Sequence, residues 1–244
     1  MTKISILTPT IRKKGLDLVR NALKKQSFRS FEWLIASKFN PEIPEASWVK
    51  DEFEGGFWAI NRIYNQLVKE VKTDLLISWQ DYTYSKFDTL ERFYFHYQDE
   101  PKTLVTAVGN KYTQVLPELG AMVWKDPRER ILGQSNFYSC NYIDIEYNLC
   151  AIPKEAIYAI GGFDEDLDFI GYGHGFSELE RLHILGGYDF KIDQSIKSYS
   201  LAHERYKDWD EHNFVNKDMT FIPEYIDRRK KYLENPNLGF LKGE

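Results

Sequence analysis

The sequence of 244 residues is 43% hydrophobic and 28% charged, which supplies a sizeable core and excludes a disordered chain. A formal net charge of −5 excludes the basic character typical of nucleic-acid-binding domains, and two cysteines exclude a disulfide framework. No charged and apolar leader precedes the first predicted strand, and no run reaches the roughly 18 apolar residues of a membrane span. We therefore expect a cytoplasmic protein without a transmembrane segment.

Strands and helices are expected to alternate through the first 110 residues. Short runs of apolar and β-branched residues predict strands at 4–8, 31–36, 75–79 and 103–108. Apolar residues at helical spacing predict helices at 16–25, 59–71 and 88–97. Because the two element types alternate, we expect an α/β domain in which a mostly parallel sheet lies between two layers of helices.

The second half of the sequence has a less regular pattern. Residues 111–147 are expected to form an insertion that faces the substrate. Three further helices are predicted, over 153–160, 178–185 and 223–233. We expect the residues after 233 to form a tail. No repeat or linker interrupts the chain, so we expect one domain over 1–244.

Ligands of parallel sheets bind beyond the carboxyl ends of the strands. The segments that follow the predicted strands are therefore candidates for a binding site: 8–12, 37–38 and 80–82. Asp81 follows a buried strand directly, and we expect its carboxylate to face the cleft.

Phosphate-loop, CxxC and HExxH motifs are absent, but five other elements follow one another along the chain. They are SILTPT at 5–10, AINR at 59–62, TDLLISWQDY at 73–82, NLCAIP at 148–153 with IGGFDE at 160–165, and RL at 181–182 with GGY at 186–188. In this order and spacing they resemble the motifs of family-2 glycosyltransferases, which have the GT-A fold.

The resemblance implies a Rossmann-like three-layer fold and the transfer of a sugar from a nucleotide-diphosphate sugar. Residues 1–110 would bind the nucleotide sugar, 111–205 would bind the acceptor and carry out catalysis, and 206–244 would form a C-terminal helix and tail. UDP is the nucleotide and inversion the stereochemistry that the resemblance favours. The acceptor would be a saccharide, a lipid-linked glycan or another hydroxyl group. A modified nucleic-acid base is a further acceptor that we do not favour.

The donor site implied by the resemblance lies at the ends of the first strands. The residues expected to contact the nucleotide sugar are Thr8, Pro9, Thr10, Arg12, Ser37, Asn61 and Asp81. Where the family commonly has aspartates that contact the base and ribose, this sequence has Ser37 and Lys38.

A divalent cation is the expected cofactor. Mn²⁺ or Mg²⁺ stabilises the charge that develops on a departing diphosphate, and both ions prefer carboxylate oxygens. Asp81 is the expected ligand, although Gln80 and Tyr82 leave one carboxylate where the family has two or three. His203 is expected to assist Asp81, because imidazole also binds Mn²⁺. Alternatively, Asp81 only caps the following turn.

Inverting transfer needs a base that removes the proton of the acceptor hydroxyl. The family supplies it from a Glu-Asp pair, and residues 175–176 occupy that place here without a carboxylate. We favour Glu178 as the base, with His174 as the alternative. Asp164 and Asp168 follow as further candidates. Alternatively, Glu178 only complements the helix dipole.

A second hypothesis follows from the two places where this sequence departs from the pattern of the family. The single carboxylate at 80–82 and the missing Glu-Asp pair are also what a protein without catalytic activity would show. Such a protein would keep the fold and bind a nucleotide or sugar as a scaffold.

Overall fold

The computed structural model describes residues 2–55, 57–130, 135–170, 175, 177–202 and 223–241. The strands are β1 (Ile4–Pro9), β2 (Phe31–Ser37), β3 (Ser47–Lys50), β4 (Leu75–Trp79), β5 (Thr83–Ser85), β6 (Thr103–Tyr112), β7 (Met122–Trp124), β8 (Phe137–Ser139), β9 (Leu149–Pro153) and β10 (Asp189–Leu201). The α-helices are α1 (Leu16–Lys24), α2 (Ile60–Glu70), α3 (Thr89–Asp99), α4 (Lys154–Ala159), α5 (Ser177–Leu185) and α7 (Pro223–Glu234). Three short 3₁₀ turns are η1 (Lys13–Gly15), η2 (Tyr142–Asp144) and η3 (Glu165–Ile170).

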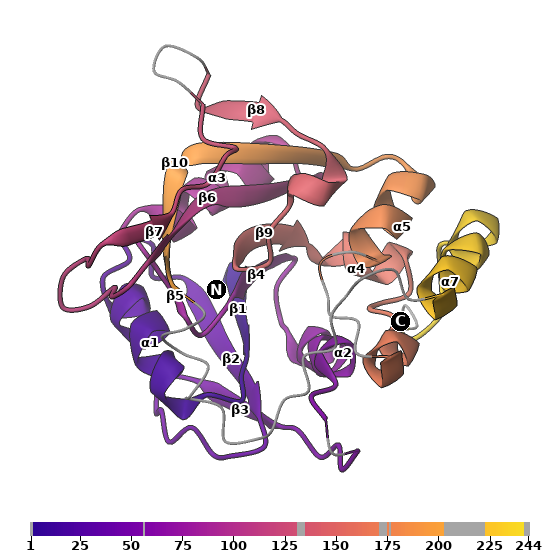
Figure 1. Cartoon of the computed structure of the whole chain (residues 1–244), viewed down its shortest axis with the longest axis horizontal. Helices are drawn as coiled ribbons and strands as arrows, with labels where there is room; N and C mark the ends of the chain where they lie inside the picture. The colour runs from indigo at the N-terminus through magenta and orange to yellow at the C-terminus, as the bar shows by residue number, and fades with distance from the viewer. Residues whose placement is uncertain are drawn as a thin grey trace.

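One mixed sheet forms the centre of the molecule (Figure 1). Its strands run in the order β3-β2-β1-β4-β9-β6-β10-β5, with β7 beside β6 and β8 beside β10. The first four strands in this order are parallel to one another. β9 runs antiparallel to both of its neighbours, β4 and β6. A strand from the second half of the chain therefore lies between two strands from the first half.

Helices cover both faces of the sheet, as expected for a three-layer α/β/α fold. Along β1, Ile4 and Ile6 point into a core that α1 and α3 close. Leu7 points the other way, into a core that α2, α4 and α5 close. Because both faces are buried, β1 and β4 are buried along their whole length and read as mostly apolar runs rather than as alternating ones. The predicted fold class is confirmed.

The predicted strands and helices of the first half are all present, with ends that differ by a few residues. The helix predicted at 153–160 is α4, and the one at 223–233 is α7. The sequence analysis missed β10, a strand of 13 residues. The buried positions of this strand include the polar residues Gln194, Ser198 and Ser200, which interrupt the alternation of apolar residues that would have revealed it.

Residues 235–241, which follow α7, are hydrogen-bonded to the turn after α4. The amides of Leu238 and Leu241 donate to the carbonyls of Ile160 (3.1 Å) and Gly161 (2.8 Å), and Leu241 is buried in the core. Gly161 and Gly162 both have positive φ, of 71° and 93°. A Cβ atom at Gly162 would lie 2.8 Å from Leu241, so glycine is required here for backbone conformation and for space.

None of the helices in the described residues is long and apolar enough to cross a membrane.

Candidate functional site

The carboxyl ends of β1, β2 and β4 meet at one edge of the sheet, because these strands are parallel. β9 runs antiparallel to β4, so the residues that precede β9 lie at the same edge. The amide of Gln80 donates to the carbonyl of Asn148 (3.1 Å), which joins the loop after β4 to the loop before β9. We call residues 10–15, 37, 80–82 and 146–148 the strand-end site.

Asp81 and Arg12 form a buried ion pair in the strand-end site. The Nε and Nη2 groups of Arg12 donate to the two carboxylate oxygens of Asp81, at 2.9 and 2.6 Å. The hydroxyl of Thr10 donates to one of the same oxygens. The sequence predicts that Asp81 faces the cleft; in the structure Arg12 and Thr10 cover its carboxylate, and the side chain is fully buried.

The turn between β1 and α1 packs directly on the backbone of Asp81. A Cβ atom added to Gly15 would lie 2.4 Å from the carbonyl oxygen of Asp81, so only glycine lets the turn come this close. The guanidinium carbon of Arg12 lies 5.2 Å from the ring centroid of Tyr82. Gly15 and Tyr82 thus fix the place of Arg12 over the ends of β1 and β4.

Thr8 and Pro9 belong to the sheet that supports this site. The hydroxyl of Thr8 accepts from the indole of Trp33 and donates to the carbonyl of Trp79, both at 2.9 Å. The Thr8 side chain is fully buried. Pro9 is the last residue of β1 and is also buried. Neither side chain lies at the surface of the strand-end site.

Ser37 and Asn61 are buried, one at the end of β2 and the other at the start of α2. The hydroxyl of Ser37 donates to the carbonyl of Phe39 (2.6 Å). The backbone amide and the side-chain amide of Asn61 both donate to Asp168, at 3.0 and 2.9 Å. Asn61 therefore joins the start of α2 to η3.

A chain of polar contacts leads from Tyr82 to the loop before β9. The hydroxyl of Tyr82 donates to Asn148 (2.5 Å), and the amide of Asn148 donates to Glu146 (3.1 Å). The side chain of Glu146 is 40% exposed, so its carboxylate reaches solvent at this edge. The sequence analysis did not select Glu146. The signal that could have found it is its place just before the apolar segment 149–153.

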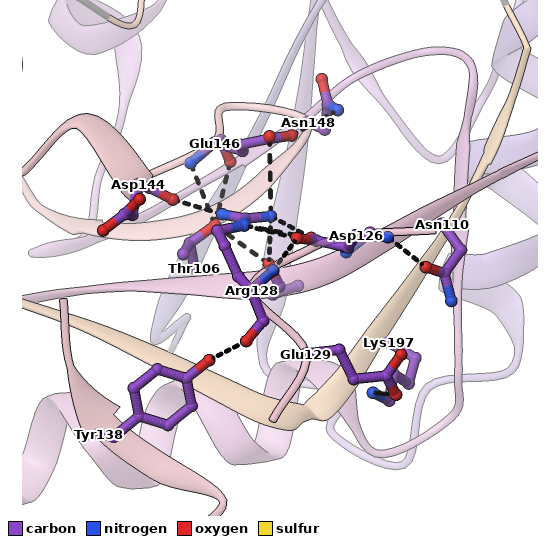
Figure 2. A network of polar contacts seen from close by, with 12 residues as sticks. Thr106, Asn110, Asp126, Arg128, Glu129, Tyr138, Asp144, Glu146, Asn148 and Lys197 are labelled. Carbon is purple, nitrogen blue, oxygen red and sulfur yellow. Dashed lines mark hydrogen bonds and ion pairs between the residues drawn. The ribbon is translucent and has the colours of Figure 1, made fainter. Parts of the chain in front are cut away.

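Arg128 lies at the centre of this second network (Figure 2). It donates to the carboxylate of Asp126 and to the carbonyl of Asp144, and it lies 3.7 Å from Glu146. Burial tends to raise the pKa of Asp126, but hydrogen bonds from Arg128 and from the amide of Gly109 outweigh it and lower the pKa below its usual value. Arg128 thus holds the loop before β9 against β6 through a charged pair.

Glu178 lies on α5, away from solvent. Its side chain is fully buried and accepts a hydrogen bond from the amide of Gly175. Burial raises the pKa of Glu178, and the amide of Gly175 and the charge of Arg181 oppose that rise. The alternative base, His174, lies outside the described residues.

Asp164 pairs with a helix rather than with the strand-end site. Its two oxygens accept from Nε and Nη2 of Arg228, each at 2.6 Å, and from the hydroxyl of Tyr232 at 2.7 Å. Asp164 is fully buried and holds α7 against the turn that follows α4.

Asp168 caps the start of α2. Its oxygens accept from the backbone amides of Asn61 and Arg62, each at 3.0 Å. Burial raises the pKa of Asp168 to about 7, against the hydrogen bonds from these two residues.

A pH dependence of stability follows from Asp168. The folded state binds its proton more tightly than the unfolded state, whose pKa is near 3.8, so the free energy of unfolding should fall as pH rises from 4 to 7. The slope from one such group is at most about 1.4 kcal/mol per pH unit. Urea unfolding at several pH values should show a flatter dependence in Asp168→Asn and an unchanged one in Asp189→Asn, an exposed control. If the free energy of unfolding depended on pH in the same way in Asp168→Asn and in the parent, the raised pKa of Asp168 would be contradicted.

The described residues do not fit a divalent cation at Asp81. Both oxygens of Asp81 are engaged by Arg12 and Thr10, and the neighbour Gln80 is neutral. Within the described residues, no group of three or more His, Cys, Asp and Glu side chains could hold a metal ion. His203 lies outside these residues, although Leu201 donates its amide to the carbonyl of Tyr82 (2.9 Å).

The sheet order, the two helical layers and the site at the strand ends define a GT-A-like α/β fold, and known structures share it. The crystal structure of GalNAc-T7 with UDP, GalNAc and Mn²⁺ matches with a TM-score of 0.62 at 10% sequence identity, over 83% of this chain and 44% of that one. The structure of residues 1–349 of TarS from S. aureus with UDP matches with a TM-score of 0.58 at 11% identity, over 95% of this chain and 70% of that one. The present chain thus spans less than half of the GalNAc-T7 chain. The sequence matches no family model and no curated protein.

Proposed function

We propose that this chain is a glycosyltransferase that moves a sugar from a UDP-sugar to the hydroxyl group of an acceptor. The observation that carries the proposal is the strand-end site, where Arg12 lies at the carboxyl edge of a GT-A-like sheet. Ligands of open α/β sheets bind at this edge, and a diphosphate is bound by guanidinium groups. The GalNAc-T7 and TarS structures described above both contain UDP, which supports UDP as the nucleotide.

The donor would contact Arg12 in the strand-end site, whose side chain is 9% exposed. Thr8, Pro9, Thr10, Ser37 and Asn61 would support this contact from beneath, since their side chains are buried. The Mn²⁺ of the GalNAc-T7 structure is a precedent for the expected cation, but the side chains around Asp81 do not support one here.

We assign the acceptor to the side of the strand-end site formed by Glu146 and Asn148. Glu146 is a partly exposed carboxylate, and it is joined to Tyr82 through Asn148. A saccharide, free or lipid-linked, is the acceptor class that we propose. Glu178 remains the candidate base of an inverting reaction, and its buried carboxyl would have to become accessible for this role.

A protein that binds a nucleotide or sugar without catalysis is the second candidate. It is favoured by one observation, the complete burial of the carboxylates of Asp81 and Glu178. The two candidates share the donor site and differ in turnover.

UDP at millimolar concentration is expected to raise the melting temperature of the protein. A ligand that binds only the folded state at 100 times its dissociation constant adds about 2.7 kcal/mol, which is several degrees for a chain of this size. Uridine is the control, because it lacks the diphosphate. Release of UDP from UDP-sugars, followed in the same samples, separates an enzyme from a binding protein. If no purine or pyrimidine nucleoside diphosphate raised the melting temperature, the donor site that both candidates share would be rejected.

A further inference from the structure

We propose that a cavity at the edge of the sheet opposite the strand-end site is a second binding site, which takes an uncharged saccharide. The cavity has a volume of about 610 Å³ and lies where β4 begins, β9 ends and α4 begins. None of the residues that line it belongs to the strand-end site. The inference therefore does not depend on the proposed function.

The cavity lies between the two helical layers of the fold. Tyr97, near the end of α3, packs against the core that α1 and α3 close. Tyr158, in α4, packs against the core on the opposite face of the sheet. The amide of Lys154 donates to the carbonyl of Asp74 (2.8 Å), which joins the end of β9 to the start of β4. Since β4 has five residues, roughly 16 Å separate this cavity from the strand-end site.

The lining of the cavity carries as many positive as negative side chains. Lys69 and Lys154 supply two ammonium groups, and Asp74 and Glu155 supply two carboxylates. In the part of the chain that the structure describes, none of these four groups forms an ion pair. The ammonium of Lys154 instead lies 3.5 Å from the carbonyl oxygen of Val71. A lining without net charge gives no advantage to phosphate or another ion, but it offers donors and acceptors side by side.

Tyr97 and Tyr158 complete the lining, and both side chains are partly exposed. Burial raises the pKa of Tyr97, and the negative charges of Asp74 and Glu155 raise it further. The hydroxyl of Tyr97 therefore stays protonated and can donate a hydrogen bond. The ammonium of Lys154 lies 5.5 Å from the ring centroid of Tyr158. The two tyrosines thus bring flat apolar faces to the same cavity as the four charged groups.

A saccharide matches this combination of groups. Its C–H groups form an apolar face that packs against an aromatic ring, and its hydroxyls both donate and accept hydrogen bonds. Carboxylates accept from such hydroxyls and ammonium groups donate to them, so an uncharged saccharide can use both kinds of group. The volume of the cavity falls within the range of about 300–1,000 Å³ that is usual for small-molecule sites.

NMR titration of isotope-labelled protein with neutral trisaccharides tests this inference. The probes are maltotriose, mannotriose, galactotriose and N,N′,N″-triacetylchitotriose, and inorganic phosphate is the charged control. We expect at least one trisaccharide, but not phosphate, to shift the backbone amide signals of Asp74 and Glu155.

Two variants locate the binding. Tyr97→Ala should weaken it about tenfold, because it removes an aromatic face. Glu155→Ala should weaken it about threefold or more, because it removes an acceptor. Phe95→Ala is the matched control, since Phe95 also lies on α3, is 59% exposed and does not line the cavity. It should leave the dissociation constant within about twofold of the parent.

The outcomes are distinguishable. Glu155 is exposed, so its substitution stays informative if Tyr97→Ala folds poorly. Absence of shifts at the cavity with all four trisaccharides, or binding that neither variant weakens, would overturn the inference. Phosphate that shifts the same signals would overturn the uncharged class of ligand. Shifts confined to Glu146 and Asn148 would also overturn the second site, and would support the acceptor side of the proposed function.

Discussion

Arg12→Ala is expected to lower the free energy of unfolding by about 3–5 kcal/mol, the usual cost of removing one partner of a buried ion pair. Among the described residues, the substitution leaves the buried carboxylate of Asp81 with the hydroxyl of Thr10 as its side-chain donor. Chemical denaturation followed by circular dichroism measures the loss. Asp81→Asn should also be destabilising, since it removes the negative charge that pairs with the guanidinium of Arg12.

The double variant Arg12→Met with Asp81→Asn provides the control for this prediction. Replacing both members of a buried pair is often close to neutral, so the double variant should be more stable than Arg12→Ala. The buried-pair geometry would be contradicted if Arg12→Ala unfolded at the denaturant concentration of the parent. In that case the pair would be solvent-exposed in solution, where such pairs contribute about 0–1 kcal/mol.

Arg181→Met is the second substitution for which we expect a large effect. The guanidinium of Arg181 is fully buried and donates to the carbonyls of Ile160 (2.7 Å), Gly162 (2.8 Å) and Ser177 (3.2 Å). Burial lowers the pKa of Arg181, and the charge of Glu178 opposes that shift. Methionine fills a similar volume but leaves these carbonyls without the guanidinium donor and leaves the buried Glu178 without the nearby positive charge. We expect a loss of at least about 3 kcal/mol.

Arg181→Lys tests the reason for this loss. The planar guanidinium of arginine reaches several separate carbonyls at once, and the compact ammonium group of lysine cannot. Lysine should therefore recover only part of the stability. Arg92→Met on α3 removes an arginine whose side chain is 42% exposed, and it should change stability by no more than about 0.5 kcal/mol. If Arg181→Met proved as stable as the Arg92→Met control, the contacts of Arg181 would contribute little.

The parts of the fold that sequence analysis predicted are those with local signals. β1 and β4 are buried on both faces and read as short apolar runs, and α2 has apolar residues at helical spacing along its buried face. β3 follows a loop that contains Pro41 and Pro44, and its four residues are partly exposed, so no pattern marks it. Segments whose pairing partner decides their conformation are missed, because that partner is far away in the sequence.

The sequence predicted which segments lie together at the edge of the sheet, but not the contacts that their side chains make. The ends of the parallel strands correctly brought 8–12, 37 and 80–82 to one edge. The pairing of Arg12 with Asp81 joins residues separated by 69 positions, and no local pattern encodes it. Glu178 could not be placed either, because its burial depends on how α5 packs against η2 and α7. The roles proposed for these residues remain predictions that the experiments above test.

The position of β9 between β4 and β6 has a consequence for how the chain folds. Until residues 149–153 arrive, β4 and β6 each present an open strand edge, and β6 is separated from the four parallel strands. A fragment that ends before β9 therefore lacks the strand that joins β6 to β4. Strand pairs this distant in sequence form late, since the loop between them must close first. The chain is thus expected to gain or lose its structure as one cooperative unit, with both sides of the strand-end site folding together.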